Sequence, residues 1–279
     1  MMDSLIKDIR YGFRSLLKHP GATAVALFTL ALGIGVNTAI FSAVDSVLLR
    51  PLPLKDSERL VSIWEHTLRV GVRQNEVAPA NFFDLRDQNQ VFEDIGAYGP
   101  DDVNMTGQGE PEHLDGQLVT ANVFSILGVK PALGRTFLPN EDQEGQDRVV
   151  VLNDALWQRR FNRDPSIVNR AITLNGESFT VVGVMPPGFF FPEHQIELWA
   201  PWAMEPEQKS GRGDHYLRLV ARLKPGTTIE RANADIASIA QRLSIEYPRT
   251  NEGLGFVTHS LHQDYVGNLR SPMLILFAA

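Results

Sequence analysis

The sequence predicts an α+β domain carried on one membrane-spanning helix, and two observations lead to this prediction. Residues 20–44 contain no formally charged side chain, whereas residues 50–270 alternate short strand-like runs with amphipathic helix-like runs. About 20 uncharged, mostly apolar residues are enough for a helix to cross a hydrocarbon layer of roughly 30 Å. Alternation of the two element types over a longer region is typical of a folded domain that contains both helices and a sheet.

Charge is distributed unevenly along the chain, which has 279 residues, a formal net charge of −7 and no cysteine. Residues 1–20 carry four basic and two acidic side chains, and residues 271–279 carry no charge, so the acidic excess lies in residues 50–270. An acidic body argues against a general nucleic-acid-binding protein. The lack of cysteine excludes a disulfide framework and a thiolate site.

The first 20 residues are predicted to form an amphipathic helix. Basic side chains occupy the faces that the apolar residues leave free, which is typical of a helix lying in the membrane interface. A helix that binds a partner without touching lipid is the alternative. Pro20 is expected to break or bend the helix before the uncharged run. The apolar positions at helical spacing are Leu5, Ile6, Ile9, Phe13, Leu16 and Leu17.

The uncharged run itself is longer than the apolar segment of a cleavable export signal, which spans about 7–15 residues. An uncleaved membrane span is therefore preferred over a cleaved signal or a buried helix of a soluble protein. Gly33 and Gly35 resemble part of a dinucleotide-binding loop, but Thr38 occupies the place of the third glycine and the surroundings predict helix interior.

Small residues recur at every fourth position of this span. Such spacing lets two helices approach closely in lipid, with another helix of the same chain or of a second chain as the partner. Ordinary membrane-helix composition is the alternative explanation. The predicted helix-packing residues are Ala31, Gly35, Ala39 and Ala43.

Residues 50–270 are predicted to form an α+β body with a central insertion. A hairpin is expected to turn at Asn175-Gly176, the strongest short hairpin signal. Residues 215–261 indicate a β-α-β unit, residues 59–106 a looser one, and residues 107–210 a region richer in strand. Strands are predicted at 59–65, 113–119, 148–153, 171–185, 215–223 and 255–261, and helices at 80–88, 120–128, 154–161 and 228–247.

The sequence indicates no catalytic, cofactor-binding or metal-binding residues. The seven histidines lack metal-ligand spacing, and the Gly-x-Ser-x-Gly motif of hydrolases is absent. Residues 128–136, GVKPALGRT, differ from a phosphate-binding loop in spacing and have Arg135 in place of lysine, so a structural turn is expected. The acidic pairs Asp101-Asp102 and Glu141-Asp142 are expected in solvated loops.

Two apolar segments have two interpretations each. Phe189, Phe190 and Phe191 precede a proline and are expected either in the core, the preferred interpretation, or in a contact patch on the outer domain. Residues 271–279, SPMLILFAA, predict either a short buried helix or the start of a second, truncated membrane span, since Pro272 suits a first helical turn.

Several motifs, in a consistent order, resemble the MacB/FtsX-type ABC transporter permeases. LALGIGVNTAIFSAVDSVLLRPLP is similar to the first span of that family. Similarity to the extracytoplasmic core domain of its large permease-like branch is carried by NFFDLRDQNQVFEDIGAY, LGVKPALGRTF, VVVLNDALWQRRF and ITLNGESFTVVGVMPPGFFFP.

The resemblance implies a cytoplasmic interfacial helix (1–20), a first transmembrane helix (21–49), a periplasmic core domain (50–270) and the start of a second span (271–279). The core domain would comprise a discontinuous porter-like β-α-β subdomain (57–106 and 213–265) and an inserted strand-rich subdomain (107–210).

The same resemblance implies a permease component of the plasma (inner) membrane, in which a cytoplasmic ATPase in trans moves the periplasmic domain. Implied partners are the lipid bilayer, that ATPase, and transmembrane helices of the same chain or of a second permease chain in a dimer. No cofactor and no nucleic acid is implied. The alternatives are a membrane-anchored periplasmic binding or scaffold protein without ATP coupling, and a membrane-tethered enzyme, which the lack of a catalytic constellation disfavours.

Overall fold

The computed structural model describes residues 11, 16–44, 52–67, 72–107, 109–265 and 267, and the chain divides into two compact units. Unit 1 comprises residues 1–50 and 266–279, and unit 2 comprises residues 51–265. The predicted terminal segment 271–279 and most of the predicted head helix lie outside the described residues. Of the head, Tyr11 and residues 16–18 are helical, and His19 interrupts the helix before the uncharged run.

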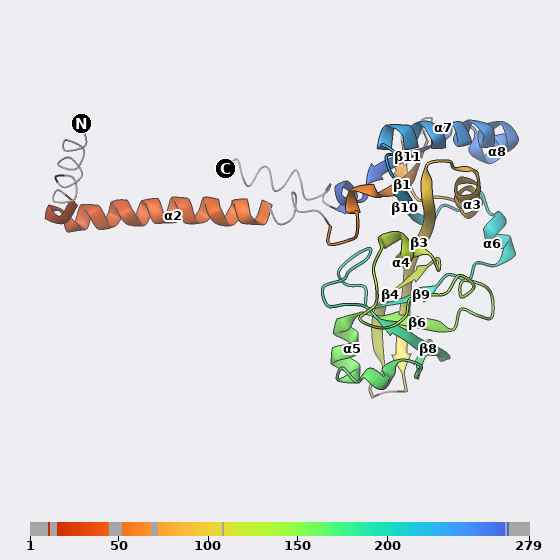
Figure 1. Cartoon of the computed structure of the whole chain (residues 1–279), viewed down its shortest axis with the longest axis horizontal. Helices are drawn as coiled ribbons and strands as arrows, with labels where there is room; N and C mark the ends of the chain where they lie inside the picture. Colours follow the sequence, from red (N-terminus) through yellow and green to blue (C-terminus); the bar gives the residue numbers. More distant parts are fainter. Residues whose placement is uncertain are drawn as a thin grey trace. The chain divides into compact units, whose positions relative to one another are not determined.

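The uncharged run forms one helix, α2 (Pro20–Val44), the long orange helix in Figure 1. Proline suits its first position, where a backbone N–H would lack a partner within the helix. The Thr23 hydroxyl donates a hydrogen bond of 2.7 Å to the carbonyl of Leu16, the last turn before the break. Large apolar side chains on α2 are exposed, Phe28 by 71%. The segment Pro20–Thr38 is long and apolar enough to cross a membrane, as predicted.

Unit 2 is built on one mixed sheet, whose strand order is β11-β1-β10-β3-β4-β9-β6-β8-β5. In that order the strands are β11 (Leu254–Ser260), β1 (Leu60–Thr67), β10 (Arg218–Leu223), β3 (Phe92–Thr106), β4 (Glu112–Val119), β9 (Leu198–Pro201), β6 (Val149–Leu152), β8 (Glu177–Val184) and β5 (Leu133–Gly134). Two further strands pair outside this path, β2 (Val72–Asn75) with β1 and β7 (Ala171–Leu174) with β3 and β8.

The part of the sheet from β11 to β3 contains two interleaved β-α-β connections, β1–α3–β3 and β10–α7–β11. Because β1 runs antiparallel to both β10 and β11, and β3 antiparallel to β10, each connection encloses one strand of the other. This arrangement is the split β-α-β topology of ferredoxin-like folds. Its helices, α3 (Pro79–Gln88) and α7 (Ile229–Glu246), bury their apolar stripes in one cluster against β1, β3 and β10.

The predicted helix and strand runs of this part are therefore confirmed. The looser β-α-β unit predicted over 59–106 is also confirmed, but no strand run was identified for its second strand, β3. Its sequence contains Gly96, Gly99 and Pro100, which are typical of turns. Close packing explains both glycines: a Cβ at Gly96 would lie 2.8 Å from a methyl of Val123, and one at Gly99 would lie 2.7 Å from the Trp202 ring. β3 pairs with β10 along its first half and with β4 along its second, so it belongs to both parts of the sheet.

The part of the sheet from β4 to β5 carries shorter helices, and Figure 1 shows α5 beside it, at the end of unit 2 opposite α7. The predicted hairpin is confirmed: β7 and β8 pair from Leu174 and Glu177 outward, and the turn residues Asn175 and Gly176 both have positive φ. The remaining helices are α4 (Val123–Leu127), α5 (Asp154–Phe161), α6 (Pro206–Ser210) and α8 (Pro248–Asn251), with short 3-10 turns at η2 (Ser57–Arg59) and η4 (Pro165–Ile167).

Two acidic pairs differ from expectation. Asp101 and Asp102 lie on β3 rather than in a loop. Glu141 is 7% exposed and forms a bidentate ion pair with Arg135, at 2.6 and 2.8 Å, which closes the turn that the GVKPALGRT segment begins. That segment was predicted to be a structural turn. Its first residue, Gly128, ends α4 in the left-handed conformation, but Leu133 and Gly134 form the short strand β5 against β8.

Candidate functional site

Both ends of unit 2 lie against the same hydrophobic cluster. Leu52 and Leu54, near the first residue of the unit, pack on it, and so do Leu261 and Tyr265, at the last residues. Phe189, from the loop that follows β8, packs on the same cluster. We call this region the junction and define it as residues 52–59, 186–190 and 261–265. Through its first and last segments the chain of unit 2 continues into unit 1.

A buried arginine holds the first segment of the junction. Arg222, on β10, is 6% exposed and donates hydrogen bonds to the carbonyls of Lys55 at 2.8 Å and Asp56 at 3.3 Å. Its Nε donates to the carbonyl of Ile126, in α4, at 2.7 Å. Burial lowers the pKa of this guanidinium. One side chain of the sheet thus fixes the first segment and a helix on the same face.

A second arginine, which lies in the first segment itself, strengthens this attachment. Arg59 donates from Nε and Nη2 to the carbonyl of Leu223, at 2.9 and 2.7 Å, and forms an ion pair with Glu93. Since Leu223 is the last residue of β10 and Glu93 lies near the start of β3, the first segment is attached to two strands of the sheet.

The last segment of the junction is fixed to β1. The Asp264 carboxylate accepts a hydrogen bond of 2.7 Å from Trp64 Nε1 and a second one from the Ser62 hydroxyl. Tyr265 contacts the ring of Phe190 edge-on, with centroids 6.0 Å apart. Burial raises the pKa of the Tyr265 hydroxyl well above its usual value. Polar and apolar contacts therefore hold the last segment together.

The structure separates the three phenylalanines of the predicted contact patch. Phe191 is fully buried and contacts the Tyr98 ring edge-on at 4.8 Å, so it belongs to the core. Phe189 and Phe190 are partly exposed and line a small apolar pocket of about 120 Å³ in the junction, together with Leu54 and Tyr265. A patch open to a partner would consist of these two residues alone.

The predicted helix-packing residues lie on α2. Ala31 and Gly35 are exposed, and a Cβ at Gly35 would meet no atom within 4 Å. The side chains of Ala39 and Ala43 lie outside the described residues. The contact that this spacing predicts stays a prediction.

A buried polar network joins α3 to the segment that leads into β10. Glu65, 1% exposed, accepts hydrogen bonds from Ala78 N at 3.2 Å and Asn81 Nδ2 at 2.8 Å. Its second oxygen lies 2.5 Å from His215 Nδ1. The hydrogen bond to Glu65 raises the pKa of His215. Arg212 extends the network with a hydrogen bond of 2.8 Å to Asn81 Oδ1.

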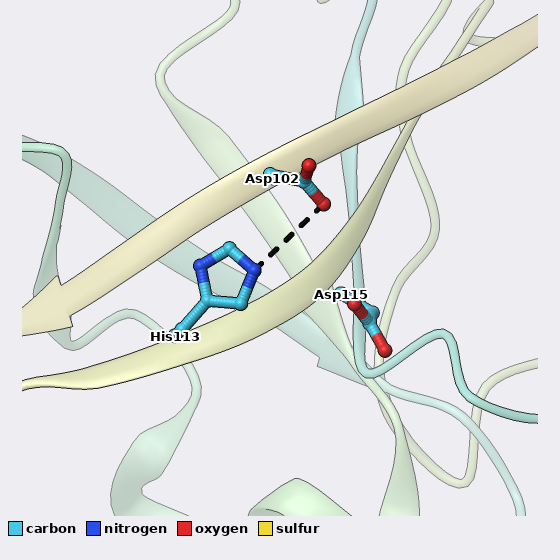
Figure 2. Close-up of side chains that lie close together, drawn as sticks. All are labelled: Asp102, His113 and Asp115. Atoms are coloured by element: carbon cyan, nitrogen blue, oxygen red, sulfur yellow. Dashed lines mark ion pairs between the residues drawn. The ribbon is translucent and has the colours of Figure 1, made fainter.

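A surface cluster on β3 and β4 has the donor types of a metal site. Figure 2 shows Asp102 and His113 facing each other across the two strands, with Asp115 beside them. Their ligand atoms lie within 4.8 Å of one another, and His113 Nε2 is 4.0 Å from the Asp102 carboxylate. The side chains of His113 and Asp102 are 59% and 73% exposed, and exposed carboxylates are well hydrated without an ion. We assign no site to this cluster.

Comparison with known proteins gives one family and a consistent fold. Residues 23–239 match the family described as MacB-like periplasmic core domain. The periplasmic region of MacB from Actinobacillus actinomycetemcomitans is similar in structure, with a TM-score of 0.54, 13% identity, and coverage of 84% of this chain and 98% of that one. The extracellular domain of the noncanonic ABC-type transporter YknZ from Gram-positive bacteria gives a TM-score of 0.51, 13% identity, and coverage of 71% and 99%. No curated protein matches the sequence.

Proposed function

Because the chain belongs to the MacB-like periplasmic core domain family, we propose that it is a non-enzymatic permease component of a MacB/FtsX-type ABC transporter. In this proposal unit 2 lies on the periplasmic or extracellular side of the plasma membrane, and the N-terminus lies in the cytoplasm. A cytoplasmic ATPase in trans moves unit 2 mechanically. We further propose the porter-like (57–106 and 213–265) and inserted (107–210) subdomains as the moving parts.

The junction is the observation that carries the proposal. A domain that is pulled or tilted from the membrane must be attached firmly at the points where its chain leaves it, since a flexible connection would absorb the displacement. In unit 2 the first segment is held by Arg222 and Arg59, and the last by Asp264. Both segments pack on one cluster, so a displacement of either would reach β1, β10 and β3 directly. Packed elements with two arrangements can carry such a movement.

The absence of cysteine from the sequence makes a topology test direct. Single cysteines at exposed Lys18 and exposed Lys130 would be treated with a membrane-impermeant maleimide in cells with an intact inner membrane. We expect reaction at residue 130 and none at residue 18 until the membrane is lysed. The reverse pattern would contradict the proposed orientation, and loss of residue 18 from the mature protein would indicate a cleaved signal.

Energy coupling needs a separate experiment, because a membrane-anchored scaffold without ATP coupling would give the same topology. The full chain carrying F190C would be reconstituted in liposomes with the ABC ATPase that co-purifies from its native membrane. We expect ATP on the ATPase side to change the maleimide reaction rate at residue 190. The control is S178C, an exposed position at the β7–β8 hairpin, away from the residues that line the junction. An unchanged rate at residue 190, or the absence of any co-purifying ATPase, would favour the scaffold.

A further inference from the structure

A second cavity, distinct from the junction, lies where three parts of unit 2 meet. It has a volume of about 360 Å³, within the range of small-molecule sites, which starts at about 300 Å³. One wall is α3, with Phe83 and Arg86, and another is the 139–143 loop, with Asp142. The third is the connection from β9 to β10, with Trp202 and Lys209. A molecule bound there would contact α3, the 139–143 loop and the β9–β10 connection at once.

The guanidinium of Arg86 is positioned but has no bidentate acceptor. Its Cζ lies 5.0 Å from the centroid of the Phe83 ring and 5.4 Å from that of Phe82, so the guanidinium packs against both rings. Its recorded ion pair is a 3.6 Å contact from Nε to the neighbouring Asp87, which leaves both terminal nitrogens without a hydrogen-bond acceptor among the described residues. A planar guanidinium held in this way suits a carboxylate.

Two more donors of the cavity lack acceptors. Trp202 is held by the outer edge of its six-membered ring, which covers Gly99, and by the Tyr216 ring at 5.7 Å. Its indole N–H makes no hydrogen bond within the described part of the chain, and the same holds for the Lys209 ammonium. The Asp142 carboxylate in the cavity wall already accepts two hydrogen bonds, from Ala121 N at 3.1 Å and from the side-chain amide of Gln143 at 2.9 Å.

We propose that this cavity binds a small aromatic carboxylate, with its carboxylate at Arg86 and Lys209 and its ring against Trp202. Three donors without acceptors, beside the partly exposed rings of Phe83 and Trp202, call for a ligand that has anionic acceptors and a flat apolar part. The proposal is independent of the proposed transport function, because it concerns binding to unit 2 alone and needs neither ATP nor a partner chain.

The test is a titration of the full chain in lipid nanodiscs with benzoate, 4-hydroxybenzoate and indole-3-acetate, followed by tryptophan fluorescence and by calorimetry. The uncharged amide of each acid serves as the matched probe, and inorganic phosphate tests for binding of the charge alone. We expect saturable binding of at least one acid, no binding of its amide, and loss of the fluorescence response in W202F.

Variants then locate the site. R86M and K209M should each raise the dissociation constant at least tenfold, whereas R231M and K130M, which remove exposed cations elsewhere, should change it less than twofold. R86K, which keeps the charge and the packing on Phe83, covers the case in which R86M does not fold, and it should also weaken binding because it loses the planar fork. No saturable binding of any acid, equal binding of the amides or of phosphate, or full binding by K209M and R86K would overturn the proposal.

Discussion

The carboxylate of Asp264 lies 2.7 Å from the indole Nε1 of Trp64, and this contact fixes the last segment of unit 2 to its second-to-edge strand. The same carboxylate accepts from the Ser62 hydroxyl. Since Ser62 and Trp64 are two residues apart on β1, their side chains share one face of the sheet. The helical turn at residues 261–265 therefore docks along β1 rather than extending freely from β11.

Replacing Asp264 by alanine should release the last segment. Two hydrogen bonds would be lost and the Trp64 N–H left without its acceptor, which costs about 1–3 kcal/mol. Hydrogen exchange of the amides of residues 261–265 should be faster in D264A than in the wild type, whereas exchange of the β10 amides should stay slow. The exposed loop variant E144A is the control. Equal protection of the last segment in D264A and the wild type would show that Leu261 and Tyr265 hold it unaided.

Replacing Arg222 by methionine should loosen the first segment. The methionine keeps most of the buried aliphatic volume but leaves the carbonyls of Lys55 and Ile126 without their donor. We expect a loss of about 2–4 kcal/mol in the free energy of unfolding, because unsatisfied buried acceptors cost about 1–3 kcal/mol each and partial hydration recovers some of it. Urea unfolding measures the change, with R231M as the control. A loss no larger than that of R231M would contradict the role given to Arg222.

The sequence predicted most elements of unit 2 but not how its ends are held. Periodicity identified α3, α5 and α7, and Asn175-Gly176 identified the β7–β8 hairpin, because these signals are local. The looser β-α-β unit over 59–106 implied a second strand, but the residues of β3 were not identified, because its glycines are required by close contacts with side chains distant in sequence, those of Val123 and Trp202. The contacts of Arg222 with residues 55 and 126 could not be predicted for the same reason. An arginine within an apolar strand does not indicate which distant carbonyls accept its hydrogen bonds. Glu65, a carboxylate at the end of an apolar run, was a weak indication of the buried polar network that surrounds it.

Stability should depend on pH through His215. Its pKa is raised from 6.5, first by the hydrogen bond to Glu65, with Asp214 and the Glu76 backbone also favouring the charged form. A raised folded-state pKa means that the added stability is fully present below pH 6.5 and is lost as the pH rises through the higher value. The difference in unfolding midpoint between wild type and H215Q should therefore be largest at about pH 5.5 and shrink toward about pH 9. A difference that is constant across that range would exclude the coupling.

Gly116 tests the packing between β3 and β4. A Cβ there would lie 2.4 Å from the backbone oxygen of Asp101, its cross-strand partner, and backbone cannot move aside as a side chain can. We expect G116A to destabilise unit 2 by about 1–3 kcal/mol, as overpacked positions do. G213A is the matched control, because a Cβ at Gly213 meets nothing within 4 Å. Thermal unfolding measures the effect. Equal shifts of the unfolding midpoint in G116A and G213A would mean that β3 and β4 separate easily at this point.

The proposed helix contact on α2 can be tested at Gly35. The residue is exposed and has open space beside it, so leucine there leaves the fold of unit 2 unaffected. If Ala31 and Gly35 meet another membrane helix closely, the leucine side chain separates the two backbones and the contact is lost. We expect G35L to reduce cross-linked oligomers of the full chain in native membranes several-fold, whereas G21L, at the helix end and also without neighbours within 4 Å, should not. Unchanged oligomer yield and unchanged abundance in G35L would assign the small residues to ordinary membrane-helix composition.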